Sequence, residues 1–228
     1  MTAEESLTLR DSIRKRPGMY IGDSTGLGLR FMFRELLTDV LDDAKSPPVI
    51  TMTLTSDGAV VIDYVTDVPA FYADDGATSV VESMLATPGY PGKRIWNGVC
   101  VAIALASSAV VDIYDSGKHL QQYFDRGLPT TALRVVGSTA RQGMALRVVP
   151  DPAHFPNPRL AYHPLCGQVR DLAILHSCAR IRIDDESSGS RMDFHYQEGI
   201  KSYLEELLYT KIKSPADLIV LRSDEGAI

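Results

Sequence analysis

The sequence predicts an α+β fold in which helices cover one face of a mixed, mostly antiparallel sheet. Two patterns lead to this fold class. Apolar residues recur at helical spacing from Leu29 to Leu41, and strand-like runs separated by turn residues fill the middle of the chain. At 228 residues, 45% of them hydrophobic, the chain can bury a sizeable core, and we expect a single domain over residues 1–228.

Each element follows from a local pattern. One face of the first helix is apolar: Leu29, Met32, Phe33, Leu36, Leu37, Val40 and Leu41. Its other face carries Glu35, Asp39 and Asp42. A β-hairpin follows, in which two apolar runs flank Ser56-Asp57-Gly58. Further helices are expected at 79–86, 98–107, 167–177 and 198–208. Strands are expected at "VVDIYD", "LQQYF", "ALRVVG", "MALRVVPD", "ARIRIDD" and "RMDFHY".

Composition excludes several classes of protein. The formal charge of −6 gives no general attraction to nucleic acid, so we expect no autonomous DNA binding. The one dense basic cluster is Arg10, Arg14, Lys15 and Arg16. The longest apolar run, 99–111, is too short to span a bilayer, and the start lacks a signal-peptide pattern. Three widely spaced cysteines predict core thiols. We expect a cytoplasmic protein with no membrane role.

Four stretches give the chain a family resemblance: "RKRPGMYIGD" at 14–23, "RELLTDVLDDA" at 34–44, residues 125–151, and "RIRIDDESSGSRMDFHYQEGIKSYLEEL" at 180–207. They resemble the N-terminal ATPase domain of the B subunit of bacterial DNA gyrase and its topoisomerase IV counterpart, in the GHKL superfamily. The resemblance implies the two-layer Bergerat-type ATPase fold and ATP with Mg²⁺ as ligands. It also implies a gyrase-like partner. No transducer domain is expected within the chain.

The resemblance assigns roles to two residues of the acidic helix. Glu35 matches the glutamate that polarises the attacking water, and Asp39 stands where the family has the asparagine that holds Mg²⁺. A spacing of four residues puts both side chains on one helix face. From the residues alone, a solvated acidic face formed by Glu35, Asp39 and Asp42 is the better explanation, and the catalytic assignment depends on the resemblance. Asp39 is a doubtful metal ligand, because its carboxylate suits Mg²⁺ but adds negative charge beside a triphosphate.

The nucleotide-binding motifs depart from the family pattern. Asp63 and Pro69 match the aspartate that receives the adenine amino group and a following proline. Between them, Val65 and Asp67 replace the two glycines that let a nucleotide approach the backbone. Thr66 stands where an arginine is expected.

The phosphate-binding lid and the adenine pocket depart as well. In "RIWNGVC", 94–100, only Gly98 and Val99 match the glycine-rich run that binds phosphate through backbone N–H groups. Trp96 could plug the cleft, and Lys93 and Arg94 could attract phosphate or be plain surface charges. Met144 replaces a threonine that helps to bind adenine.

These losses predict a pseudo-ATPase: a gyrase-B-like domain that has lost ATP binding and works as a protein-binding or regulatory module. Its partner would be a gyrase or topoisomerase IV subunit. The alternative is a weak ATP-binding domain or slow ATPase that uses Glu35, Asp39 and Asp63 with ATP and Mg²⁺. A decoy for gyrase-directed inhibitors is a third reading, against which Val65 and Met144 count. We expect no cofactor under the first hypothesis, and a monomer in dilute solution.

Overall fold

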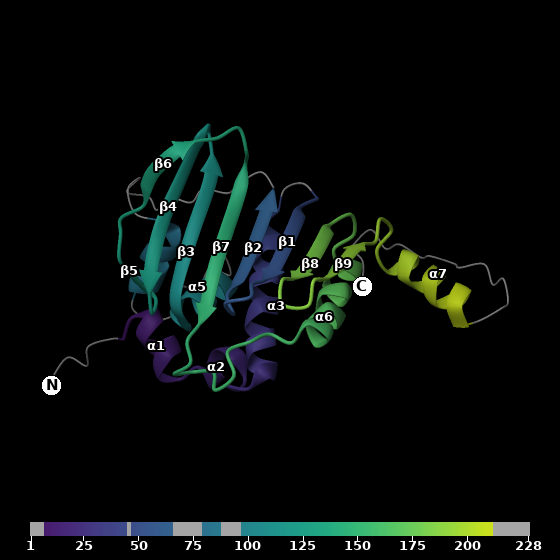
Figure 1. The fold of residues 1–228 in the computed structure, drawn as a ribbon, viewed down its shortest axis with the longest axis horizontal. Helices are drawn as coiled ribbons and strands as arrows, with labels where there is room; N and C mark the ends of the chain where they lie inside the picture. Colours follow the sequence, from purple (N-terminus) through teal and green to yellow (C-terminus); the bar gives the residue numbers. More distant parts are fainter. Residues whose placement is uncertain (1–6, 45–46, 66–78, 88–96, 212–228) are drawn as a thin grey trace.

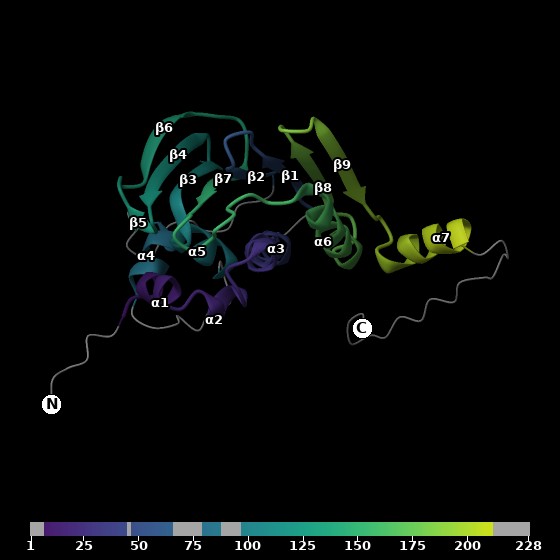
Figure 2. The same ribbon diagram turned by 60° about the horizontal axis from the view of Figure 1, so that its bottom comes forward.

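The protein is described by a computed structural model, which covers residues 7–44, 47–65, 79–87 and 97–211. A broad sheet forms one layer and helices form the other (Figure 1). When the molecule is turned, α1 to α6 lie on a single side of the sheet, and α7 projects beyond its end (Figure 2). The predicted α+β class, with helices on one face, is confirmed.

The helices and strands follow the chain in a mixed order. The helices are α1 (Leu9–Lys15), α2 (Gly18–Ile21), α3 (Gly26–Asp43), α4 (Val80–Ala86), α5 (Asn97–Ala104), α6 (Tyr162–Leu175) and α7 (Ile200–Lys211). The strands are β1 (Val49–Leu54), β2 (Val60–Val65), β3 (Ala106–Asp115), β4 (Lys118–Asp125), β5 (Leu128–Pro129), β6 (Arg134–Ser138), β7 (Gly143–Pro150), β8 (Arg180–Asp185) and β9 (Ser190–His195).

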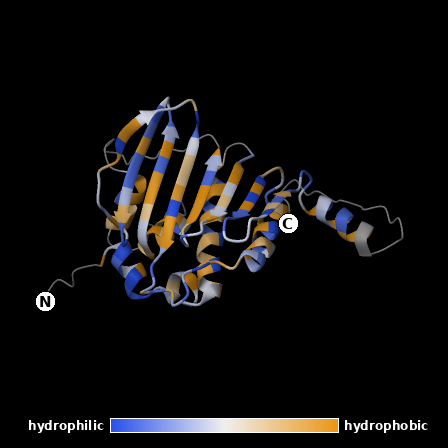
Figure 3. Ribbon diagram, viewed as in Figure 1, coloured by the Kyte–Doolittle hydropathy of each residue, from blue (hydrophilic) through white to orange (hydrophobic). Residues whose placement is uncertain are grey.

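The strands form one nine-stranded sheet in the order β5-β4-β3-β7-β2-β1-β8-β9, with β6 paired to β4. Among the described strand pairs only β1 with β8 is parallel. Alternate residues of each strand face the helices, so apolar and polar side chains alternate along the central strands (Figure 3). We call the side without helices the open face.

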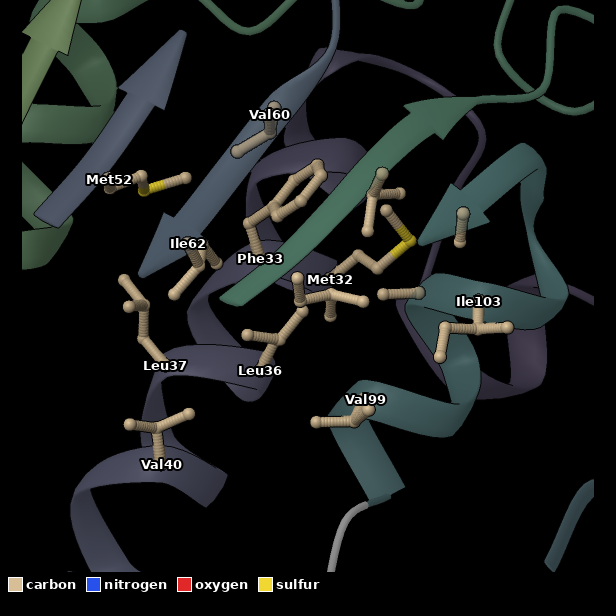
Figure 4. Packing of buried hydrophobic residues seen from close by; sticks show 14 of the residues in the cluster. Met32, Phe33, Leu36, Leu37, Val40, Met52, Val60, Ile62, Val99 and Ile103 are labelled. Carbon is tan, nitrogen blue, oxygen red and sulfur yellow. The ribbon is translucent and has the colours of Figure 1, made fainter. Parts of the chain in front are cut away.

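The core lies between the sheet and α3. Met32, Phe33 and Leu36 of α3 are almost fully buried, and they pack beneath Val60 and Ile62 of β2 (Figure 4). Two threonines cap the helices that frame this core. The Thr25 hydroxyl accepts a hydrogen bond from Leu27 N–H at the start of α3, and the Thr8 hydroxyl accepts from Asp11 N–H at the start of α1.

Several predicted elements differ in their bounds. Helix α6 begins at Tyr162, before the predicted start, because Pro164 falls in its first turn, where backbone N–H groups have no partner within the helix. Helix α5 ends at Ala104, and Ser107 belongs to β3. The short helices α1 and α2 are not among the elements that the sequence pattern predicts. The predicted β1–β2 hairpin and its turn are confirmed.

Two further expectations concern cysteines and membranes. Cys100 and Cys166 are buried and free, as expected of core thiols. Cys178 is exposed, which corrects the prediction, because it lies in the turn before β8 with a positive φ of 72°. Within the described ranges no helix has the length and apolarity needed to cross a membrane.

Two arginines of the basic cluster near the N-terminus, Arg14 and Arg10, hold α1 against other parts of the fold. Arg14 donates to Ala104 O at 2.7 Å and forms an ion pair of 2.8 Å with Asp151, whose side chain is 5% exposed. Arg10 donates to Arg126 O at 2.9 Å. Burial alone would raise the pKa of Asp151, but hydrogen bonds from Arg14 and Ala153 N–H outweigh it and hold that pKa below its ordinary value. These contacts pin α1 to the ends of α5, β4 and β7.

Replacing Arg14 by methionine should destabilise the fold by roughly 3 kcal/mol, because it leaves the buried Asp151 carboxylate with only the more distant Arg126, at 4.0 Å, as a cation. Urea unfolding at pH 7 measures the loss. Arg16→Met, at an exposed position nearby, serves as the control and should change stability by about 0.5 kcal/mol or less. Since the pKa of Asp151 is lowered, the difference should shrink as the pH falls below about 4; a pH-independent or negligible difference would contradict this role.

Candidate functional site

The candidate site is built where α5 crosses α3. Glu35 and Asp39 lie one turn apart on α3, and α5 begins beside them at Asn97. A Cβ atom on Gly98 would lie 2.5 Å from the carbonyl carbon of Glu35 and from the nitrogen of Leu36. Only glycine therefore permits this approach. Gly98 has a packing role that does not depend on any ligand.

The Asp39 carboxylate caps the N-terminus of α5. Its Oδ2 accepts hydrogen bonds from Gly98 N–H at 2.6 Å and Val99 N–H at 3.3 Å. Burial raises the pKa of Asp39 to about 7, against the lowering effect of these N–H groups. The nearby carboxylates of Glu35 and Asp42 raise it further.

The Asp39 cap occupies a position where a helix can bind an anion. The free N–H groups at a helix N-terminus are a ready site for an anion, such as a phosphate. Two of these groups on α5 are bound to the chain's own carboxylate. The structure thus brings Asp39, Gly98 and Val99 together, as the resemblance implied, with the backbone of Glu35 beside them. Their mutual hydrogen bonds replace contacts that an external anion would make.

Asp63 lies on the other side of the sheet. Along β2 the side chains of Val60, Ile62 and Tyr64 are buried towards the helices, so Asp63 points to the open face. There its carboxylate forms an ion pair with Arg141. The structure does not bring Asp63 together with Glu35 and Asp39.

Arg141 ties Asp63 into a polar network on the open face. Its guanidinium lies 4.2 Å from the centroid of the Tyr114 ring. The ring of His119 lies 4.7 Å from that of Tyr114, and its Nε2 contacts Asp112 at 2.7 Å. This network occupies the carboxylate that the resemblance assigned to adenine.

On the face of the sheet that the helices cover, the Tyr64 side chain lies next to Met144. The two residues are cross-strand neighbours on β2 and β7, and both side chains are buried, at 2% and 0% exposure. The Tyr64 hydroxyl donates to the Met144 sulfur at 3.8 Å. Large side chains therefore fill the sheet surface at the position where the resemblance implied an adenine contact. Tyr64 was missed in the sequence, although the alternation of Val60, Ile62 and Tyr64 marks it as inward-facing.

Other predicted residues lie outside the described residues. They are Thr66, Asp67, Pro69, Lys93, Arg94 and Trp96. Val65, which replaces the first glycine, ends β2 and is 49% exposed.

The residues around Asp39 do not fit a magnesium site. Mg²⁺ prefers ionised carboxylate oxygens in an octahedral arrangement. The Asp39 oxygen that faces α5 is already bound to two N–H groups, and the raised pKa of this carboxyl disfavours its ionised form. In the part of the chain that is described, no group of three or more His, Cys, Asp or Glu side chains is arranged to hold a metal ion.

Comparisons with known proteins identify relatives of the chain. No protein-family model matches it. It is 32% identical over 216 residues to the B subunit of DNA gyrase from Enterococcus faecalis, covering 86% of this chain and 33% of that protein. It is 28% identical over 233 residues to the type 2 topoisomerase B subunit of Aquifex aeolicus, covering 96% of this chain and 29% of that protein. The chain spans about a third of the length of these curated relatives.

A solved structure shows the same fold. The 43K ATPase domain of Thermus thermophilus gyrase B, in complex with an aminocoumarin, superposes with a TM-score of 0.78 at 27% identity. The match covers 90% of this chain and 56% of that one.

The raised pKa of Asp39 predicts how the effect of replacing this residue on folding stability depends on pH. Between about pH 4 and 7 the unfolded chain releases this proton while the folded protein keeps it, so the contribution of Asp39 to stability falls as the pH rises. Asp39→Asn does not titrate. Its stability relative to wild type should therefore increase by roughly 2–3 kcal/mol from pH 5 to pH 8, given about 1.4 kcal/mol per pKa unit.

Urea unfolding at several pH values tests this. Asp171→Asn, which removes a carboxylate whose side chain is 67% exposed, is the control and should show little pH-dependent difference. An Asp39→Asn difference that stays constant from pH 5 to pH 8 would show that this carboxyl does not titrate as assigned.

Proposed function

The chain is homologous to the N-terminal ATPase domain of the B subunit of DNA gyrase, and we propose that it is a pseudo-ATPase version of that domain. In this proposal it has lost ATP binding and acts as a protein-binding or regulatory module on a type II topoisomerase. The observation that carries the proposal is the Asp39 carboxylate on the N–H groups of Gly98 and Val99.

Electrostatics support the loss of phosphate binding. A bound triphosphate would have to displace the Asp39 carboxyl from the N–H groups of Gly98 and Val99. Hydrogen bonds between a charged group and N–H donors contribute about 1.5–3 kcal/mol each. Losing two of them lowers affinity by more than about a hundredfold. Repulsion from the Glu35 carboxylate adds to this loss.

The adenine side of the site supports the same proposal. Tyr64 and Met144 fill the helix-facing surface of β2 and β7. Asp63 is bound to Arg141 on the open face. An adenine amino group would therefore lack its carboxylate partner. For this reason Asp39→Asn alone, which supplies the residue of the family, should not restore nucleotide binding.

A second candidate function is weak ATP binding or slow hydrolysis with Mg²⁺. Two observations favour it: the homology to an ATPase domain, and Glu35 at the position of the water-polarising glutamate. Under this alternative Glu35 would act as general base and Asp63 would leave Arg141 to bind adenine. Hydrolysis by the wild type that is abolished in Glu35→Ala would establish it.

The proposed partner follows from the relatives. The matched proteins are gyrase and type 2 topoisomerase subunits. A domain with the same fold can occupy contacts that the authentic ATPase domain makes in such an enzyme. The chain would then modulate supercoiling without consuming ATP.

ATP, ADP and a non-hydrolysable analogue, each at millimolar concentration with Mg²⁺, should not raise the melting temperature. Ligand at a hundred times its Kd would stabilise the fold by about 2.7 kcal/mol, which is a shift of about 5–10 °C for a domain of this size. Differential scanning fluorimetry measures the shift, with the T. thermophilus ATPase domain assayed alongside. A shift of several degrees would overturn the loss of ATP binding.

Purified chain should change the rate of supercoiling by gyrase from its own cells, at constant ATP. The effect should persist in Glu35→Ala, because the proposed role needs no chemistry at that residue. Gel assays of plasmid topology measure the rate. Unchanged supercoiling, together with a pull-down that recovers no topoisomerase subunit, would remove the proposed partner while leaving the ATP-binding result intact.

A further inference from the structure

Strand β9 ends the sheet, and no described strand lies along its outer edge (Figure 1). Its six residues pair with β8 in one unbroken register. The opposite edge of the sheet is less regular, because β5 has two residues and the pairing of β6 with β4 is shifted between His119 and Leu120. A regular sheet edge offers free main-chain groups to another strand. Among the described strands, β9 is therefore the edge best suited to pairing.

Hydrogen bonds at the two ends of β8 show which main-chain groups of β9 are free. Arg180 N–H donates to Pro48 O, and Glu186 N–H donates to Leu54 O, each at 3.0 Å. The even-numbered residues of β8 therefore face β1, and its odd-numbered residues face β9. Their partners on β9 are residues 190, 192 and 194. The N–H and C=O groups of residues 191, 193 and 195 are left at the edge, where no other described strand binds them.

Two side chains of opposite sign lie along this edge. Phe194 is buried towards the helices, so Arg191 and Asp193 point to the open face. Their side chains are 61% and 47% exposed. Each has one partner on β8: Arg191 pairs through Nε with Asp184, and Asp193 pairs through Oδ1 with Arg182. A guanidinium has five N–H donors and a carboxylate has two acceptor oxygens, so each group can take a second partner.

This pattern is complementary to itself. When β9 is laid antiparallel to a second β9 with Met192 opposite Met192, Arg191 of each strand lies opposite Asp193 of the other. Positions 191 and 193 are also those whose main-chain groups are free, so hydrogen bonding and charge select the same register. A shift of two residues either way would place Asp193 opposite Asp193 or Arg191 opposite Arg191, and like charges directly opposite each other are destabilising.

The ion pairs within each copy are kept in this register. One row across the join reads Arg182, Asp193, then Arg191 and Asp184 of the second copy, so positive and negative charges alternate. Each of the two edge charges then lies between two groups of opposite sign. Charged side chains commonly protect edge strands from pairing. Here their order along the strand favours one pairing, that of β9 with itself.

We propose that two copies of this chain associate through β9, antiparallel about a two-fold axis at Met192, so that their sheets become one. The occupant of the edge is a second copy because β9 matches itself in charge and in free main-chain groups. Met192, which is 41% exposed, would meet its counterpart on the axis. This inference goes beyond the proposed function and does not require the loss of nucleotide binding.

The contact closes at two chains, because each copy contributes the same edge. Helix α7 follows the C-terminal end of β9 and projects beyond the sheet (Figure 2). Antiparallel pairing places the α7 helices of the two copies at opposite ends of the joined strands. One pair of strands gives an interface at the small end of the specific range, so association is weak and depends on concentration. The monomer expected from the sequence is the low-concentration form.

Sedimentation velocity from about 10 to about 500 µM tests the association, since a contact of this size is weak. At 0.1 M salt the weight-average mass should rise from the 25.0 kDa of one chain towards twice that value and no further. Raising the salt to 1 M shortens the Debye length from about 10 to about 3 Å and should lower the mass at each concentration. A mass that stays at one chain throughout, or that passes two chains, would overturn the proposal.

Charge reversal tests the pairing of Arg191 with Asp193. Arg191→Asp alone should stay monomeric, and so should Asp193→Arg alone, because each places like charges opposite each other. An equimolar mixture of the two variants should associate again, since every opposite pair is then matched. Arg147→Asp, which breaks an ion pair with Asp57 on the open face away from β9, is the control and should associate like the wild type. A mixture that fails to associate would contradict the charge match.

A cross-link tests the register, in a Cys178→Ser background because Cys178 is the exposed cysteine. Met192→Cys treated with oxidised glutathione should form a disulfide-linked dimer, since the Cα atoms of such a central pair lie about 4.5 Å apart and a disulfide spans about 4.4–6.8 Å. Ser190→Cys is the control: its two copies would lie about 13 Å apart along the strands and should not cross-link. Non-reducing gels measure the product. No cross-link in Met192→Cys, or equal cross-linking in both variants, would refute the proposed register.

Discussion

The close approach of α5 to the backbone of α3 at Gly98 is the contact on which the rest of the site depends. Without a side chain at 98, the first N–H groups of α5 come within hydrogen-bonding distance of α3. Whatever residue stands at 39 then decides what those groups bind. With aspartate at position 39, the first N–H groups of α5 form hydrogen bonds to a carboxylate of α3.

The sheet divides the remaining polar groups between its two faces. Along a strand, successive side chains point to opposite faces of the sheet. A shift of one position along β2 therefore moves a side chain from the face covered by helices to the open face. Tyr64 and Met144 extend the apolar layer above α3, whereas Asp63 joins Arg141 and Tyr114 in a network on the far side. Asp39 and Asp63 are thus separated in space, and each has a partner within the protein.

Much of the fold could be predicted from periodicity. The apolar stripe of α3 and the Ser56-Asp57-Gly58 turn are local patterns, and both were found in the sequence. Helix α6 begins earlier than the predicted start at residue 167, because Pro164 falls in its first turn, where the missing N–H has no cost. The parallel pairing of β1 with β8 has no local signature and depends on the tertiary fold.

The site was less predictable, for physical reasons. Comparison with the sequence motifs of the family located Glu35, Asp39, Gly98 and Val99. A sequence motif does not show which face of a strand a residue occupies. The phase of β2 is set by its pairing with β7, so the outward direction of Asp63 appears only in the sheet. Likewise, the ion pair of Asp63 with Arg141 joins residues far apart in the chain. The hydrogen bonds of Asp39 depend on a helix crossing that no spacing rule predicts.

The parallel pairing of β1 with β8 also bears on how the protein is made. The hairpin of β1 and β2 leaves the ribosome long before residues 180–185, so one side of β1 has no strand beside it until most of the chain has been synthesised. Contacts between such distant segments form slowly. A chain cut or stalled before β8 would present that bare edge to neighbouring molecules, which is the arrangement from which strand-to-strand aggregation begins.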